Sequence, residues 1–227
     1  MERHLNEDEL RGVRAVIFDF DGTLAVLNID FSFMRERVFD LMRHYGVERG
    51  VIEERYVLEI IDEVTQRVWE KDASKAATFY HEAHRILREI EIEAAVKGKL
   101  LPGVEKALAF LMEKKIKVGI VTRNCEEAVR KVFPKIEDFC NVFLSRNSIK
   151  KVKPHPEHLT TMMRMLAVIG EESMMVGDHP IDIQAGKSVG MRTVGVLTGR
   201  MKREDFEKAE ADYVLKDVSE VCSLLLS

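Results

Sequence analysis

Short apolar runs alternate with amphipathic segments along most of the chain. The first run, Val13-Arg-Ala-Val-Ile-Phe-Asp19, is rich in β-branched residues, which is typical of a buried strand in a parallel sheet. From residue 100 onward, similar runs predict strands at 116–121, 141–144, 174–177, 193–197 and 213–215, with helical spacing between them. This alternation predicts an α/β fold with a Rossmann-like, mainly parallel sheet and helices on both of its faces.

The stretch between residues 24 and 99 has a different pattern, with apolar positions three and four residues apart and no strand signal. Three sets follow this spacing: Met34, Val38, Leu41, Met42 and Tyr45; Ile52, Tyr56, Ile60, Val64 and Val68; and Ala76, Tyr80, Ala83, Leu87, Ile90 and Ala94. They predict consecutive amphipathic helices, with Asp72 and Ser74 available to cap the third. We therefore expect a core domain of residues 1–24 and 99–227, with a small all-helical domain, residues 25–98, inserted after the first strand.

Charge and composition exclude several classes of protein. The chain has 227 residues, of which 35 are basic and 39 acidic, and its net charge is −4. This balance is unlike the basic surface of a nucleic-acid-binding protein. No apolar run approaches the roughly 20 residues that span a bilayer, the amino-terminal segment has no apolar signal region, and the three scattered cysteines form no disulfide framework. We expect a cytoplasmic monomer or homodimer with no nucleic-acid or membrane partner.

Polar side chains follow the predicted strands at the carboxyl edge of the sheet, where open α/β folds bind ligands. They are Asp19 and Asp21 after the first strand, Thr122 after the second, Lys153 after the third, and Asp178 and Asp182 after the fourth. Four carboxylates, one hydroxyl group and one ammonium group are therefore expected to converge from distant parts of the chain.

This set of groups suits phosphoryl transfer. Carboxylate oxygens are preferred ligands of Mg²⁺, and the cation would offset the repulsion between Asp19 and a phosphate dianion. Asp19 can then serve as the nucleophile, while Asp21 protonates the leaving oxygen and later activates water. Lys153 and Thr122 would stabilise the equatorial phosphate oxygens, and Gly22 would let the backbone approach the phosphate.

Four motifs carry a resemblance to a known family. They are Asp19-Phe-Asp-Gly-Thr-Leu24, Val121-Thr122-Arg-Asn124, Lys153-Pro-His-Pro156 and Val176-Gly-Asp178-His-Pro-Ile-Asp182. In this order they resemble the motifs of the haloacid dehalogenase-like hydrolases, and the resemblance covers nearly the whole predicted core. It implies that Asp19 is the nucleophile and a metal ligand, and that Asp21 is the acid/base with its main-chain carbonyl on the metal. It also implies that Asp178 binds Mg²⁺ and that Asp182 does so directly or through water.

The resemblance also implies which groups hold the phosphate. Thr122 would bind it together with neighbouring backbone N–H groups, so that Arg123 and Asn124 lie at the pocket edge, and Lys153 would steady the charge on the nucleophile. The helical insertion matches the family's cap in position and size, and phosphoglycolate phosphatase-like proteins are the most similar branch. The expected partner is thus a small phosphorylated metabolite. The segment Ala25–Phe31 lacks the acidic-Ser pair of many relatives, which leaves the exact substrate open.

Other interpretations of the same residues exist. A phosphomutase of the β-phosphoglucomutase type shares the motifs but returns the phosphoryl group to a sugar. A phospho-accepting signalling module also has acidic residues and a lysine at a sheet edge, although it needs neither a lid nor Asp21. A haloacid dehalogenase lacks the second aspartate of the first motif. Lys153 could also belong to the surface run that begins at Lys150, Thr122 could be an ordinary strand residue, and Asp182 could cap the following helix.

Overall fold

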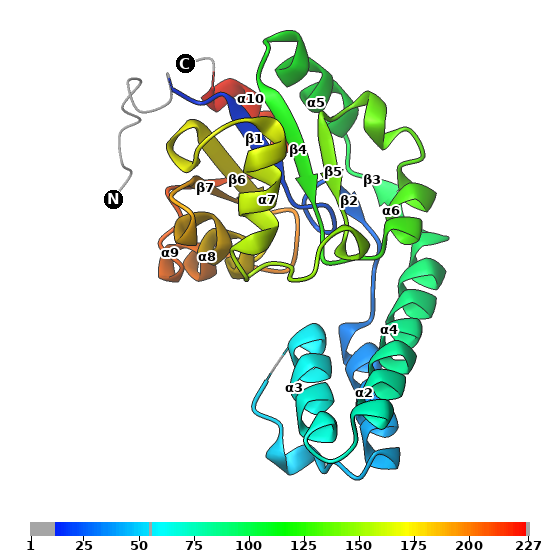
Figure 1. Cartoon of the computed structure of the whole chain (residues 1–227). Coiled ribbons are helices and arrows are strands. Elements are labelled where there is room, and N and C mark those ends of the chain that lie inside the picture. The colour runs from blue at the N-terminus through cyan, green and yellow to red at the C-terminus, as the bar shows by residue number, and fades with distance from the viewer. Residues whose placement is uncertain (1–11, 55, 226–227) are drawn as a thin grey trace. The chain divides into compact units, whose positions relative to one another are not determined.

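The computed structural model describes residues 12–54 and 56–225 (Figure 1). These residues form two compact units. The core unit comprises the described residues of Met1–Leu27 and Gly98–Ser227, and the helical unit comprises those of Asn28–Lys97. The chain thus leaves the core unit once, after Leu27, and returns to it at Gly98. Within the described ranges, no helix has both the length and the apolar character that crossing a membrane requires.

Within the described part of the chain, a six-stranded parallel sheet forms the centre of the core unit. Its strands, in spatial order, are β5 (Val142–Leu144), β4 (Lys117–Val121), β1 (Ala15–Phe18), β6 (Ser173–Gly177), β7 (Arg192–Val196) and β8 (Tyr213–Leu215). In the register of the sheet, Ile17 of β1 lies opposite Gly119 of β4 and Met175 of β6. The predicted Rossmann-like α/β fold is confirmed, and the carboxyl ends of β1, β4 and β6 meet at one edge of the sheet.

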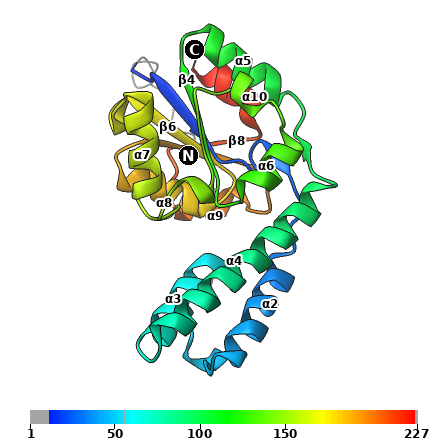
Figure 2. The same ribbon diagram turned by 45° about the vertical axis from the view of Figure 1, so that its right-hand side comes forward.

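Helices cover both faces of this sheet. They are α5 (Val104–Glu113), α6 (Glu126–Val132), α7 (Glu157–Leu166), α8 (Pro180–Ser188), α9 (Arg203–Lys208) and α10 (Val218–Leu224). On one face, Met162 of α7 and Ala185 of α8 share an apolar cluster with Ile17 of β1 and Met175 of β6. Helices α5 and α10 contact each other, and two views place them on the opposite side of the sheet from α7 (Figures 1 and 2). Both sides of the central strands are therefore buried, which explains their continuous apolar character.

Two features of the core unit lie outside the sequence-based prediction. Strand β2 (Ala25–Val26) pairs with β3 (Lys99–Leu100) in an antiparallel ladder, and α9 occupies a stretch for which no element is predicted. Strands of two residues are too short to give a periodic signal. The ladder joins the points where the chain leaves and re-enters the core unit, so that Ala25–Leu27 lie with the core unit, beyond the expected boundary at residue 24.

The helical unit contains α2 (Phe31–His44), α3 (Val57–Trp69) and α4 (Ala73–Ala95), with a short 3-10 turn, η1, at Arg49–Val51. Each of the three α-helices packs against the other two, and each buries one apolar face. The Asp72 side chain caps α4, as predicted, by accepting hydrogen bonds from the Ser74 and Lys75 N–H groups, both at 3.0 Å. The amphipathic spacing in the sequence therefore corresponds to a self-packed set of helices.

The start of α3 differs from the sequence-based prediction. The apolar spacing begins at Ile52, but the helix begins at Val57. The N–H groups of Glu53 and Glu54 donate to the Glu63 carboxylate, at 3.1 and 3.3 Å. These bonds from the backbone to a side chain hold the preceding segment outside the helix, so a helical period present in the sequence is not continued in the structure.

Candidate active site

The carboxyl end of β1 leads into a tight turn that carries the first two acidic residues. The Asp19 N–H donates to the Val176 carbonyl oxygen of β6 at 2.8 Å, so the strand pairing fixes the start of the turn. The Gly22 N–H donates to the Ala25 carbonyl oxygen at 2.7 Å, and Gly22 has a φ of 88°, a left-handed conformation that glycine adopts readily. The turn therefore holds Asp19 at the sheet edge, beside the end of β6.

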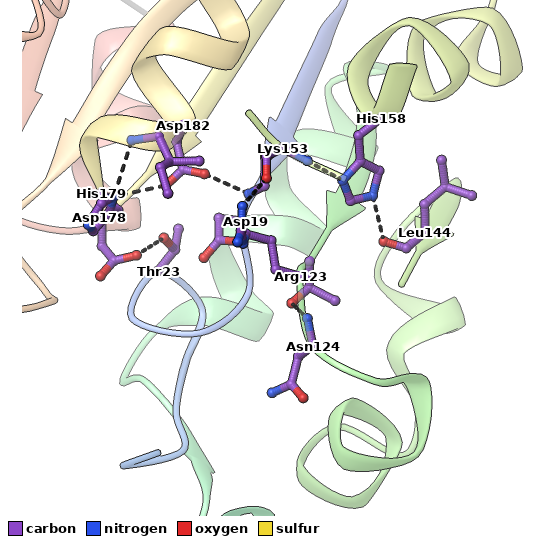
Figure 3. Close-up of polar contacts among 12 residues, drawn as sticks. Asp19, Thr23, Arg123, Asn124, Leu144, Lys153, His158, Asp178, His179 and Asp182 are labelled. Carbon is purple, nitrogen blue, oxygen red and sulfur yellow. Dashed lines mark hydrogen bonds and ion pairs between the residues drawn. The ribbon is translucent and has the colours of Figure 1, made fainter. Parts of the chain in front are cut away.

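A buried ammonium group links two of the predicted carboxylates (Figure 3). Lys153 Nζ lies 2.7 Å from Asp19 Oδ1 and 2.6 Å from Asp182 Oδ1. The Lys153 side chain is 1% exposed, whereas Lys151, two positions earlier, is exposed to solvent. The interpretation of Lys153 as a surface residue is therefore wrong, because the lysine is inside the protein, where a charge needs partners.

The Asp178 carboxylate follows β6 and lies between two glycines from distant loops. A Cβ atom on Gly22 would lie 2.1 Å from Asp178 Oδ2, and a Cβ atom on Gly199 would lie 1.9 Å from the same oxygen. The Thr23 hydroxyl donates to Asp178 Oδ1 at 3.4 Å, and the Thr198 hydroxyl donates to the Gly22 carbonyl oxygen at 2.6 Å. The turn after β1 and the loop after β7 thus lie against this carboxylate, and a Cβ atom at either glycine would force it to move.

Asp19, Asp178 and Asp182 each present a carboxylate oxygen within 4.8 Å of the other two. Burial, opposed by the Lys153 charge and assisted by the Asp182 charge, raises the pKa of Asp19 to about 7. Burial and the neighbouring carboxylates, Asp19 first, raise the pKa of Asp178 to about 9. Burial alone would lower the pKa of Lys153, but Asp182 and Asp19 outweigh it and raise that pKa. Three carboxylates lie together and Lys153 pairs with two of them, so this cluster of hard oxygen donors fits a divalent cation.

Asp182 makes two interactions at once. Its Oδ1 pairs with Lys153, and its Oδ2 accepts a hydrogen bond from the His179 N–H at 3.2 Å, at the start of α8. The interpretation of Asp182 as a helix-capping residue is confirmed, and the same side chain also belongs to the carboxylate cluster. Asp182 therefore orients the lysine as well as adding negative charge.

The loop after β4 carries the predicted phosphate-binding residues. The Thr122 N–H donates to the Leu144 carbonyl oxygen at 3.1 Å, and the Thr122 hydroxyl accepts from the Asn124 N–H at 3.1 Å. The Arg123 guanidinium donates to the Lys153 carbonyl oxygen and so ties this loop to the next. The Asn124 Nδ2 group is buried and has no hydrogen-bond partner among the described residues. Hydrogen bonds to the end of β5 and to the Lys153 loop thus hold this loop in place, and the Asn124 Nδ2 donor stays available for a ligand.

The Asp21 carboxylate lies outside the carboxylate cluster. Its Oδ1 accepts a hydrogen bond from the Leu27 N–H at 3.0 Å, and the side chain is half-buried. The structure therefore brings the other three acidic residues and Lys153 together, and holds Asp21 on the adjoining turn through a backbone contact.

Three residues that shape this site are missing from the sequence-based prediction. Thr198 and Gly199 help to enclose Asp178, and His158 contacts the backbone of Lys153. The Thr198-Gly199 pair directly follows the fifth predicted strand, and a position at a strand's carboxyl end is the signal that identifies the acidic residues. His158 has no such signal, because its neighbours become visible only in three dimensions.

A model of the haloacid dehalogenase-like hydrolase family matches residues 16–196. The chain therefore belongs to this family, and the resemblance seen in the four motifs is confirmed.

Two pyrophosphatases and a solved structure match nearly the whole chain. Pyrophosphatase PpaX of Anoxybacillus flavithermus is 28% identical over 215 residues, which cover 94% of this chain and 97% of the relative. Pyrophosphatase PpaX of Bacillus mycoides is 31% identical over 225 residues, with the same two coverages. The crystal structure of a predicted phosphoglycolate phosphatase from Haemophilus somnus matches with a TM-score of 0.62 over 94% of this chain and 98% of that chain; at 17% identity this likeness is one of fold. The chain is an enzyme of this family, of the phosphatase type.

Proposed function

We propose that this phosphatase hydrolyses small phosphomonoesters through a covalent phosphoryl-aspartate on Asp19, in a reaction that uses Mg²⁺. The observation that carries the proposal is the setting of the Asp19 carboxylate. It lies 2.7 Å from the Lys153 ammonium group and within 4.8 Å of carboxylate oxygens of Asp178 and Asp182. A buried aspartate beside a fixed cation and candidate metal ligands is what nucleophilic attack on a phosphate dianion requires.

The proposed ligands of the cation are the carboxylates of Asp19 and Asp178, with the Asp21 main-chain carbonyl and Asp182, directly or through water. The negative charge of the cluster supports its fit to a divalent cation. Because the pKa of Asp19 is raised to about 7 and that of Asp178 to about 9, the cluster needs either protons or a metal cation at neutral pH. When bound, Mg²⁺ supplies positive charge that offsets the repulsion between the carboxylate and the phosphate.

Two displacements at phosphorus complete the proposed turnover. In the first, an Asp19 carboxylate oxygen attacks phosphorus, the bond from phosphorus to the leaving oxygen breaks, and Asp21 donates a proton to that oxygen. In the second, Asp21 takes a proton from water, the water oxygen attacks phosphorus, and the bond to Asp19 breaks, which releases orthophosphate. Lys153 and Thr122 stabilise the negative charge on the equatorial oxygens in both steps.

Gly22, Arg123 and Asn124 are proposed to complete the substrate pocket. Gly22 lets the backbone approach the phosphate closely. The Asn124 Oδ1 atom accepts from the Cys125 N–H at 2.8 Å, which orients the amide and leaves its buried Nδ2 donor for a substrate oxygen. The Arg123 guanidinium already donates to the Lys153 carbonyl oxygen, so its first contribution is to hold the two phosphate-binding loops together.

Two substrate classes are candidates. The motifs favour a small phosphomonoester of the phosphoglycolate type. Inorganic pyrophosphate is the second candidate, because the relatives named as pyrophosphatases match this chain over nearly its whole length. Both are small anions whose transferable phosphoryl group the same Asp19-centred chemistry would accept.

A phosphate-release screen tests the proposal. The panel contains phosphoglycolate, pyrophosphate, sugar phosphates and p-nitrophenyl phosphate, each with Mg²⁺ and with a chelator, ranked by kcat/KM. We expect release that depends on Mg²⁺ and falls by at least about 10³-fold in Asp19→Asn. Asp138→Asn, at an exposed acidic position of the core unit, is the control and should keep the wild-type rate. Acid quenching with ³²P-labelled substrate should trap label on the wild-type protein and none on Asp19→Asn.

Other outcomes of the screen favour other functions. Release at the wild-type rate by Asp19→Asn would overturn the proposal. Interconversion of sugar-phosphate isomers that is faster than phosphate release would indicate a phosphomutase, and a stable label without turnover would indicate a signalling module.

A further inference from the structure

His158 is a fully buried histidine in the first turn of α7, outside the carboxylate cluster. Figure 3 shows its ring between the backbone of Lys153 and the end of β5. The Lys153 N–H donates to His158 Nδ1 at 3.3 Å, and His158 Nε2 lies 3.3 Å from the Leu144 carbonyl oxygen. A backbone N–H can only donate and a carbonyl oxygen can only accept, so the two partners require a neutral ring with its proton on Nε2.

The Leu144 carbonyl oxygen also accepts a hydrogen bond from the Thr122 N–H, at 3.1 Å. One oxygen at the end of β5 therefore joins the Thr122 loop directly and the Lys153 loop through the His158 ring. These two loops carry the hydroxyl and ammonium groups that the proposed reaction uses to bind the phosphate.

We infer that His158 is a positioning residue, which clamps the Lys153 backbone to the Leu144 carbonyl that also holds Thr122, and so sets the distance between two phosphate-binding side chains. The inference rests on the proposed function and adds a residue to it. Because the His158 ring is fully buried and both of its nitrogens contact the backbone, it acts through the residues that it holds.

The chemistry of the site explains why the position needs an imidazole ring. An apolar side chain could fill the same space but would leave the buried Lys153 N–H without its acceptor. A displacement of about 1 Å in a group that stabilises the transition state can cost on the order of 10²-fold in rate. Burial and the positive charge of Lys153 also lower the pKa of His158 to about 3, which keeps the ring neutral near pH 7.

A series of three variants separates the two hydrogen bonds. His158→Leu removes both, His158→Asn keeps an acceptor near the position of Nδ1, and His158→Gln keeps a donor near the position of Nε2. With p-nitrophenyl phosphate and Mg²⁺, we expect kcat of His158→Leu to fall about 10- to 100-fold while KM changes less than about threefold. The Asn and Gln variants should fall between wild type and His158→Leu. A folded His158→Leu variant with wild-type kcat would overturn the inference.

Leu166→Ala is the matched control for stability. Leu166 is buried at the other end of the same helix, so its truncation should lower the melting temperature without changing kcat. If kcat instead follows the melting temperature across all four variants, His158 has only a structural role and the inference fails.

Nitrogen-15 NMR of the histidine side chains gives a readout that does not depend on turnover. The wild-type protein should show His158 as the neutral tautomer with its proton on Nε2 at pH 7; the other tautomer or a charged ring would overturn the clamp. A protein that has the expected signature but releases no phosphate from any substrate counts against the proposed function and not against the clamp. An active protein with the wrong tautomer counts against the clamp alone.

Discussion

Among the described residues, eleven of the twelve buried polar or charged side chains belong to the core unit, and Glu91 belongs to the helical unit. In the helical unit, ion pairs such as Arg85–Glu89 join exposed side chains one helical turn apart. Exposed pairs of this kind contribute about 0.3–0.5 kcal/mol each. The core unit instead buries the Lys153 ammonium group between Asp19 and Asp182.

This difference indicates that the core unit contains buried charges that lower its stability and that the proposed reaction needs. Removing a charge from water costs several kcal/mol, and a buried ion pair recovers this cost only in part. A cluster with more carboxylates than cations is therefore a poor way to stabilise a fold, but it is suited to binding a metal cation. The helical unit has apolar interfaces between its helices and no such cluster among its described residues. In the carboxylate cluster of the core unit, we therefore expect the change in activity caused by a substitution not to follow its change in stability. In the helical unit, we expect substitutions to change stability and to leave activity unchanged.

The largest effect on stability is expected from removing the shared ammonium group. Lys153→Met leaves Asp19 and Asp182 buried without their common partner, so the free energy of unfolding should fall by about 3–5 kcal/mol. Phosphate release should lose about 10²- to 10³-fold in kcat, because a fixed positive charge is missing in the transition state. Urea denaturation and steady-state kinetics measure the two quantities.

The control for this variant lies two residues away. Lys151→Met changes the same type of side chain at an exposed position, so it should alter stability by less than about 0.5 kcal/mol and leave kcat unchanged. Equal losses in the two variants would contradict the role of Lys153 as the internal cation of the site.

A smaller effect is expected at the glycine that encloses Asp178. In Gly199→Ala, the added Cβ atom would lie 1.9 Å from Asp178 Oδ2, so the carboxylate has to move. We expect a loss of about 1–3 kcal/mol in stability and a higher Mg²⁺ concentration for half-maximal phosphate release. Gly50→Ala in the helical unit is the control, because a Cβ atom there would meet nothing within 4 Å. If Gly199→Ala keeps the wild-type Mg²⁺ dependence, the two loops do not determine the geometry of Asp178.

The helical unit was largely predictable from its sequence, because the apolar residues that form the buried face of each helix lie three and four positions apart within that helix. Helices α2 and α4 lie where this spacing predicts them. The start of α3 was not predictable, because the Glu63 side chain holds the N–H groups of Glu53 and Glu54. The residues in this contact are 10 and 9 positions apart in the sequence, and the periodic pattern of apolar residues gives no information about a polar contact of this kind.

The same distinction applies to the site in the core unit. The convergence of its charged residues was predictable, because the order of the strands and motifs assigns them to one sheet edge. The position of Gly199 after a predicted strand places it at the same edge, but the contacts that Gly199 and His158 make were not predictable. Gly199 matters because of its distance from Asp178, and His158 because of its bond to Leu144, and neither relation follows from residue type or spacing.

Replacing the Asp178 carboxylate with a neutral amide should raise stability but abolish activity. Burial and the neighbouring carboxylates raise its pKa from 3.8 to about 9. Without a cation, the folded state holds a proton that the unfolded state releases between these values, so this group's contribution to stability falls as the pH rises from 3.8 to about 9. In Asp178→Asn, we expect the free energy of unfolding at pH 8 in a chelator to rise by about 1–2 kcal/mol, and Mg²⁺-dependent phosphate release to be lost. Denaturation curves from pH 5 to 9 measure this; a variant less stable than wild type at pH 8 would contradict the charge argument.

The smallest effect is expected at the cap of α4, in the helical unit. The Asp72 carboxylate accepts from the Ser74 and Lys75 N–H groups, both at 3.0 Å, so Asp72→Ala should cost about 1 kcal/mol. Ser74→Ala is the control, since Ser74 contributes its backbone N–H and not its side chain to this cap. Because Asp72 is not part of the carboxylate cluster, we expect kcat and its Mg²⁺ dependence to stay at wild-type values while the melting temperature falls. A loss of kcat in Asp72→Ala that Ser74→Ala does not share would mean that the helical unit acts on the chemistry, and the separation of the two units would fail.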